Sequence, residues 1–304
     1  MEPVHPRFSL NQITTPRWSI PELVRACERR GVPAVALWRH RIEETGLAAT
    51  ARLVRDAGLH VSTVCRGGMF PAPTAEEFRR RLDDNLRAIE ATATLGADAL
   101  VLVCGPREGL SLGEARGMVR EGIEAILPRA IEAGVVLGIE PFHPMLIEDR
   151  SVIVTLQEAN DLAEACSDPH CGITFDTYHV FWDPCLDREI GRAAGRIVSN
   201  QISDWVLPIE GGLSSRGMIG DGYIDLAGIC AAVDDTGYAG FVEVEILSSK
   251  LGNEDHEALL ERCISRFATC MAAADARRRP GPADGDQEEG KAPGTGGAGG
   301  ARCH

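Results

Sequence analysis

The chain has 304 residues, 44% of them hydrophobic, and a formal net charge of −14. This length and apolar content suffice for one large barrel domain, and they also allow two smaller domains. The negative charge argues against a nucleic-acid partner, because the only dense basic run, at 277–279, leads into a segment rich in Gly, Pro and acidic residues.

The chain shows no signs of a membrane or secreted protein. Its first residues, MEPVHPRFSL, lack a basic segment followed by an apolar stretch, and no run of about 18 apolar residues occurs. The ten cysteines form no CxxC pair and read as reduced, structural thiols. We therefore expect a cytoplasmic protein without a membrane segment.

Short apolar, β-branched runs alternate along the chain with longer stretches of helical period. This pattern is typical of repeated βα units and a parallel sheet, and eight such units predict a single (β/α)8 TIM barrel. The predicted strands span 8–14, 34–38, 61–65, 99–104, 135–140, 172–176, 196–202 and 241–246.

After the eighth strand, a helical pattern runs from about 254 to 278 and the composition then changes. Residues 280–304 are mostly polar and rich in Gly and Pro, so we expect a disordered tail there and assign 1–279 to the barrel. The stretch 203–226, between the last two strands, is longer than a usual βα loop. Such loops at the carboxyl end of a barrel often serve as lids or substrate walls.

Four successive predicted strands end in a carboxylate or an amide: Glu140, Asp176, Gln201 and Glu245. The ends of parallel barrel strands converge on one face, so these side chains should meet. Three carboxylates in a dry site would force protonation unless a cation lies among them. The sequence therefore predicts a divalent metal site.

The segments EPFHP, FDTYH, QISD and VEVEI resemble the xylose isomerase-like superfamily of sugar-phosphate isomerases and epimerases. The resemblance covers residues 8 to about 275 and is to members related to tagatose epimerase, inosose dehydratase, 3-dehydroshikimate dehydratase and C-glycoside deglycosidase alpha subunits. It implies a TIM barrel that binds one divalent metal ion. The implied ligands are Glu140, Asp176, Gln201 and Glu245.

Gln201 departs from the commonest family pattern, in which a His stands in a segment like HVKD, whereas this chain has QISD. Three carboxylates with one hard amide oxygen favour Mn²⁺ or Mg²⁺ over zinc. The resemblance also implies that Gln occurs here among dehydratases. The alternative for Gln201 is a polar residue that caps the barrel mouth. Glu243, two residues before Glu245, should face the same side of its strand.

Several other residues are candidates for catalysis or substrate binding. His143 lies in a loop stiffened by two prolines and could act as an acid or base near neutral pH. His179 resembles a substrate-binding His, Arg66 and Arg216 could hold a carboxylate, a phosphate or sugar hydroxyls, and Trp38 could wall a sugar ring. For Trp38, core packing is the competing reading.

The favoured function is a metal-dependent isomerase or epimerase of a sugar or a sugar-like keto-polyol. It would abstract a proton α to a carbonyl through a metal-stabilised enediolate, with Glu140 and Glu245 exchanging the proton. The alternative is a metal-dependent lyase, a dehydratase or a C-glycoside deglycosidase of 3-oxo sugars, with His143 as the base. The third reading is a sugar-binding protein without turnover. A homo-oligomer or a partner subunit is compatible with the sequence.

Overall fold

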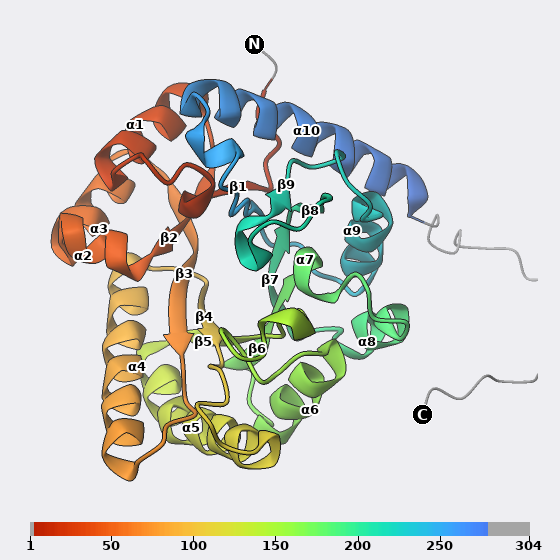
Figure 1. Ribbon diagram of the computed structural model, residues 1–304. Helices are drawn as coiled ribbons and strands as arrows, with labels where there is room; N and C mark the ends of the chain where they lie inside the picture. Colours follow the sequence, from red (N-terminus) through yellow and green to blue (C-terminus); the bar gives the residue numbers. More distant parts are fainter. Residues whose placement is uncertain (1–2, 279–304) are drawn as a thin grey trace, which may run out of the picture.

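The computed structural model describes residues 3–278, so the predicted tail lies outside the described residues. Eight parallel strands close into a barrel in the order β1-β10-β7-β6-β5-β4-β3-β2, and the helices surround it (Figure 1). The predicted TIM barrel is thus confirmed. The barrel strands are β1 (Phe8–Asn11), β2 (Ala34–Trp38), β3 (His60–Gly68), β4 (Ala99–Val103), β5 (Val136–Glu140), β6 (Cys171–Asp176), β7 (Ile197–Ile202) and β10 (Val242–Val244).

The pairing of the first and last strands closes the sheet, with Phe8 opposite Val242 and Leu10 opposite Val244. The helices are α1 (Ile20–Arg30), α2 (Arg39–Thr45), α3 (Leu47–Asp56), α4 (Ala75–Leu95), α5 (Leu112–Ala133), α6 (Leu156–Cys166), α7 (Thr177–Val180), α8 (Leu186–Arg192), α9 (Leu226–Asp235) and α10 (His256–Arg277). Short 3-10 turns lie at Gln12–Thr14, Pro144–Leu146, Gly212–Ser214 and Leu251–Asn253.

Local signals fix where the outer helices begin and end. In α5, the Ser111 side chain accepts from the backbone N–H of Glu114, whose carboxylate accepts from Ser111, and α6 begins with the same capping box. Helices α4 and α5 end at Gly96 and Gly134, which adopt the left-handed conformation. These caps satisfy backbone groups at the helix ends and define where each helix begins or ends.

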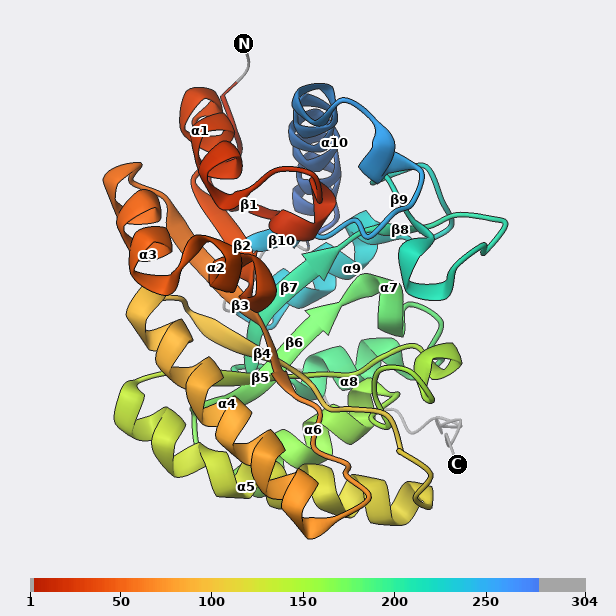
Figure 2. The ribbon, with the colours of Figure 1, turned by 60° about the vertical axis from the view of Figure 1, so that its left-hand side comes forward.

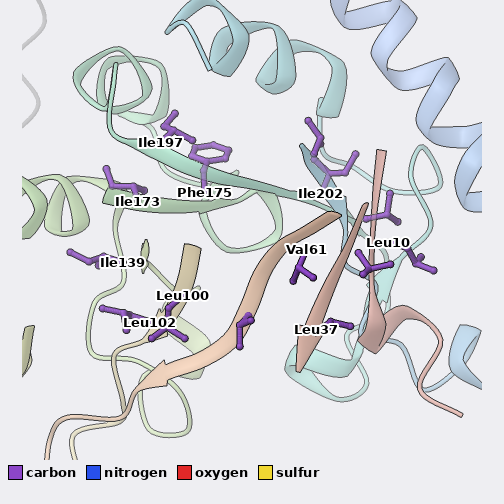
Figure 3. Close-up of a cluster of buried hydrophobic side chains, with 14 of the residues drawn as sticks. Leu10, Leu37, Val61, Leu100, Leu102, Ile139, Ile173, Phe175, Ile197 and Ile202 are labelled. Carbon is purple, nitrogen blue, oxygen red and sulfur yellow. The ribbon is translucent and has the colours of Figure 1, made fainter. Parts of the chain in front are cut away.

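The strand side chains divide into an outer apolar face and an inner polar face. Figure 3 shows the outer face, with Leu10, Leu102, Ile139 and Phe175 among the buried apolar residues. The residues that alternate with them include Asn11, Glu140 and Asp176. Because successive residues of a strand point to opposite faces, packing the apolar face under the helices turns the polar residues into the barrel.

Residues 203–226 hold a feature that the sequence did not predict. Strand β8 (Asp204–Trp205) pairs antiparallel with β9 (Arg216–Gly217), and this two-stranded ribbon lies beside β7 and β10 at one end of the barrel (Figure 2). The Asp204 carboxylate accepts from the backbone N–H groups of Gly220, Gly222 and Ile224. The long segment therefore folds back on the barrel, and its strand β9 carries the buried Arg216.

No helix within residues 3–278 is long and apolar enough to cross a membrane. Nine cysteines in this part of the chain are free thiols. Most are buried, and the Sγ atoms of Cys166 and Cys171 lie 2.8 Å apart.

Candidate metal and active site

The four strand-end residues lie in neighbouring strands at the same end of the barrel. Glu140 ends β5, Asp176 ends β6 opposite Gln201 of β7, and Glu245 directly follows β10. All four side chains are buried, with 0 to 4% of each residue exposed. The structure therefore brings together the four residues that the sequence singled out as metal ligands.

Arg216 lies among these acids. Its Nη2 atom is 2.7 Å from Asp176 Oδ2, and its Nη1 atom is 3.2 Å from Glu245 Oε2. Its guanidinium packs over the Tyr178 ring at 4.8 Å and donates to the Ser203 hydroxyl. Burial acts to lower the pKa of Arg216, but the charges of Asp176 and Glu245 outweigh it and raise that pKa. Arg216 thus stays a cation.

His179 joins the cluster from the first turn after β6. Its Nε2 atom is 3.6 Å from Asp176 Oδ2 and 3.9 Å from Glu140 Oε1, and 3.1 Å from Arg216 Nη2. Its ring stacks on Phe142, with centroids 4.1 Å apart. Burial, together with the Arg216 charge, holds the pKa of His179 well below its ordinary value. A neutral imidazole can accept a proton or ligate a metal.

Ligand atoms of Glu140, Asp176 and His179 lie within 4.8 Å of one another. The sequence had suggested His179 for substrate binding and had not included it among the metal ligands. The structure therefore adds His179 to the residues whose position would allow them to bind a metal ion.

Glu243 lies in β10, two residues before Glu245, and is fully buried inside the barrel. Its carboxylate accepts hydrogen bonds from Ser62 at 2.9 Å, Gln201 at 3.0 Å and Asn11 at 3.3 Å. Asn11 also donates to Glu245, and its own oxygen accepts from the Trp38 indole at 2.9 Å. This network fixes Gln201 and Glu245 and accounts for Glu243, which faces the interior as predicted.

The acids are costly to bury in their charged forms. Burial raises the pKa of Glu140 well above its ordinary value, and the charges of Glu245 and Asp176 raise it further. Burial likewise raises the pKa of Glu245 to about 8, against the opposing effect of Arg216. One arginine does not neutralise this cluster, so a further cation would stabilise it.

The donor set fits a divalent cation. Gln201 donates through its amide nitrogen to Glu243, which leaves Gln201 Oε1 buried and without a hydrogen bond to any residue in 3–278. Asp176 Oδ2 and Glu245 Oε2 have the Arg216 guanidinium as their ion-pair partner, whereas His179 Nδ1 has no hydrogen-bond partner within that part of the chain. Buried polar atoms are rarely left unsatisfied, and oxygen donors of this kind suit a divalent cation.

A cavity of about 180 Å³ opens beside these residues. Glu140, Glu245 and Arg216 contribute to its wall, as do Trp38 and Arg66. Trp38, Arg66 and Arg216 therefore all reach the space that the sequence predicted for substrate. Phe142, Leu213 and Leu247 supply an apolar surface, and Arg150 adds a charge that no sequence signal had indicated.

His143 lies apart from this cavity. Among the described residues that line it, Phe142 is present and His143 is not. The His143 ring packs against Trp205 at 4.9 Å and Trp182 at 5.7 Å, and its Nδ1 accepts from the backbone N–H of Met145. Burial lowers its pKa. The catalytic role suggested for His143 stays a prediction, and the geometry gives it no contact with the acids.

Comparison with known protein families places this geometry in context. The family described as "Xylose isomerase-like TIM barrel" matches residues 24–266. A 3-dehydroshikimate dehydratase of Pseudomonas aeruginosa is 26% identical over 237 residues, which are 76% of this chain and 36% of that protein. The chain thus spans about a third of the length of that curated relative.

Solved structures share the whole barrel. Protein SMc04130 from Sinorhizobium meliloti 1021 is 41% identical, with a TM-score of 0.85 over 87% of this chain and 98% of that one. The IOLI protein, whose structure holds a bound zinc atom, is 17% identical, with a TM-score of 0.77 over 88% of this chain and 98% of that one. At that identity, the second likeness supports the fold alone.

Proposed function

The chain belongs to the xylose isomerase-like TIM-barrel family, and from this premise we propose that it is a divalent-metal-dependent isomerase or epimerase of a small keto-polyol. The observation that carries the proposal is that Glu140 and Glu245, two carboxyl groups from different parts of the barrel, line the same small cavity. A carboxylate that reaches the substrate can take a proton from a carbon next to a carbonyl, and a carboxylic acid can return one.

Glu140, Asp176, Gln201 and Glu245 would hold the metal ion, with His179 as a further donor. A bound divalent cation supplies Lewis-acid polarisation of a substrate carbonyl, which acidifies the adjacent C–H bond. One of the two glutamates takes the proton from the carbon next to the carbonyl, and the other protonates the opposite face or the neighbouring carbon. Two acid–base groups in one cavity suit a reaction in which a proton is returned to the substrate carbon and no group is expelled.

Arg216, which lines the cavity, would help to orient the substrate, whereas His179 is fully buried and does not line it. The Arg216 guanidinium is fixed over Tyr178 and by Ser203, so its N–H groups are already ordered before substrate arrives. Such preorganised donors stabilise negative charge as it develops on a substrate oxygen. Trp38, held through its indole N–H by Asn11, would shield the reacting carbon from water.

A dehydratase is the second candidate, and a specific observation favours it. The curated relatives at 26% and 25% identity are both named 3-dehydroshikimate dehydratase. A dehydratase would share the initial proton abstraction and then expel a hydroxyl group from the β-carbon. In the version with His143 as base, that side chain would have to leave its packing against Trp205.

One experiment separates these candidates. The Mn²⁺-loaded protein is incubated in D₂O with ketohexoses, 3-oxo glycosides and cyclic 3-oxo acids, and the products are followed by NMR. An isomerase or epimerase gives deuterium at the carbon next to the carbonyl without loss of water, whereas a dehydratase gives an unsaturated product. Glu245→Gln should abolish exchange. If every substrate is unchanged while the metal remains bound, the proposed chemistry is wrong.

A further inference from the structure

The lining of the cavity includes two arginines besides Arg216, namely Arg66 and Arg150. They come from different parts of the barrel, β3 and the loop that follows β5. The proposed reaction needs neither of them, because the acids, His179 and Arg216 suffice for the metal and the proton transfers. Their position calls for a separate explanation.

Arg66 owes its place to an irregularity in the sheet. In the pairing of β3 with β4, Cys65 lies opposite Val101 and Gly67 lies opposite Leu102, so Arg66 is an extra residue without a partner. Such bulges redirect a side chain, and they are frequent next to binding sites. The Arg66 carbonyl accepts a hydrogen bond from Arg39 Nη1 at 3.2 Å, which fixes the backbone at the bulge.

Arg150 is held by its backbone in the same way. Its carbonyl accepts from the N–H of Gly105 at 2.9 Å, and Gly105 and Ser151 form an isolated parallel bridge. The loop after β5 is thereby tied to the end of β4. This contact places Arg150, an exposed residue, at the cavity, while Ser151 and Val152 beside it are buried.

Neither arginine has a carboxylate as a direct partner among the described residues, although the Asp84 charge acts on Arg66 and Arg150 Nη1 donates to the backbone carbonyl of Asp149 at 3.3 Å. Their neighbours are paired, since Arg39 makes a bidentate pair with Asp84 at 2.8 and 2.9 Å and Arg107 pairs with Glu148 at 2.6 Å. Within residues 3–278, no carboxylate forms an ion pair with Arg66 or Arg150. This is notable in a chain with 45 acidic and 31 basic residues.

The electrostatics of Arg66 agree with this geometry. Part of its side chain is exposed, yet desolvation lowers the pKa of Arg66, and the charges of Arg150 and Arg39 lower it further. An anion placed beside these groups would relieve their mutual repulsion. A guanidinium forms two parallel hydrogen bonds with a carboxylate or a phosphate, which a neutral hydroxyl cannot match.

We propose that Arg66 and Arg150 form an anion subsite, and that the substrate of this enzyme is a keto-polyol bearing a carboxylate or phosphate group. The inference rests on the proposed function for the keto-polyol half of the substrate. The anionic group is bound at the arginine wall, while the reacting carbons lie toward Glu140 and Glu245. The cavity of about 180 Å³ is smaller than the roughly 300–1,000 Å³ of sites for drug-sized ligands, so the substrate is a small metabolite.

Binding of matched polyols to the Mn²⁺-loaded full chain tests the subsite. D-glucitol, D-gluconate and D-glucitol 6-phosphate differ in their terminal group, and calorimetry measures the affinity of each. We expect gluconate or glucitol 6-phosphate to bind at least about tenfold more tightly than glucitol, and the tighter of the two identifies the anion. This advantage should fall with added salt.

Arginine variants then assign the effect to the subsite. Arg66→Gln and Arg150→Gln should each remove most of the advantage of the anion. Arg120→Gln is the matched control, because Arg120 is an exposed residue of α5 that lines neither this cavity nor the one next to it. If gluconate binds only by coordinating the metal, its affinity will be unchanged in Arg66→Gln and Arg150→Gln, and the subsite is refuted. Equal or undetectable binding of the three polyols also refutes it.

The subsite and the proposed reaction can fail independently. Glu245→Gln should lose proton exchange but keep the discrimination between gluconate and glucitol, since Glu245 makes no contact with either arginine of the subsite. If the protein without substitutions shows no proton exchange but still discriminates gluconate from glucitol, only the proposed reaction is refuted. Exchange on neutral keto-polyols without any anion preference would overturn the subsite alone.

Discussion

The two halves of the barrel differ in the charge of the side chains that they place at the site. Strands β5, β6, β7 and β10 supply Glu140, Asp176, Gln201 and Glu245, so that half collects negative charge and free oxygen donors. Strands β1, β2 and β3 supply Asn11, Trp38 and Arg66, which are neutral or cationic. The acidic half therefore suits a metal and proton transfer, and the other half suits the recognition of a substrate.

Arg216 is the exception to this division, because it places a positive charge among the acids of β5, β6 and β10. Arg216 lies in β9 of the two-stranded ribbon, which is separate from the barrel sheet. A barrel can thus add a compensating charge from a loop without changing the strands that carry its acids. The following predictions test whether the division between the halves holds.

Metal removal should have the largest effect. We expect dialysis against a chelator to lower turnover by at least about 1,000-fold, because the cation supplies several kcal/mol to the transition state. Metal content by mass spectrometry and rate are measured on the same samples, and Mn²⁺ should restore activity. Full turnover by protein verified to be free of metal would refute a metal-dependent acidic half.

Arg216→Met should strongly destabilise the metal-free protein. Removing one partner of a buried ion pair typically costs about 3–5 kcal/mol, since Asp176 and Glu245 would be left without their cation. Urea unfolding measures the loss. Arg120→Met serves as the control, with a change of less than about 0.5 kcal/mol at an exposed position. A loss of under 1 kcal/mol in Arg216→Met would show that the acids do not depend on this arginine.

The stabilisation that Mn²⁺ gives to the protein should increase with pH. The folded-state pKa of Glu245, about 8, lies above its ordinary value of 4.5, so the metal-free folded protein retains a proton that the unfolded chain has lost. Metal-free stability therefore falls as pH rises between these values. Binding requires the ionised carboxylates, so the Mn²⁺-induced rise in Tm should be larger at pH 8 than at pH 6. A constant or decreasing shift would contradict the raised pKa values.

His143→Ala should have the smallest effect on turnover. His143 packs against Trp182 and Trp205 outside the cavity, so we expect a less than tenfold change in kcat. General acid or base catalysis contributes about 100- to 10,000-fold. A loss in that range with unchanged stability would make His143 the base and support the lyase.

The strands and their terminal acids could be predicted because period and position carry that information. Strand β2 occupies the predicted residues 34–38, and Asp176 ends β6 as expected. The alternation that places Leu10 outside also places Asn11 inside, but a single asparagine in an apolar run gave no sign of its bonds to Glu243 and Glu245. Those bonds depend on strand register around a closed barrel.

Other parts of the site depend on contacts that no local pattern encodes. Strands of two residues have no periodicity, so the ribbon that delivers Arg216 could not be predicted. Arg150 reaches the cavity through the bridge between Gly105 and Ser151, which are distant in sequence. His143 was judged by its proximity to Glu140 in the chain, whereas the turn at Pro144–Leu146 and the tryptophans decide where it packs.

Calorimetric titration of the metal-free protein with Mn²⁺ tests the metal centre most directly. We predict one ion per chain, with affinity lowered at least about 100-fold in Glu140→Gln and in Asp176→Asn, and a smaller loss in Gln201→Leu. Binding of no ion, or an affinity unchanged by Glu140→Gln and Asp176→Asn, would contradict the assignment of these strand ends to a metal site.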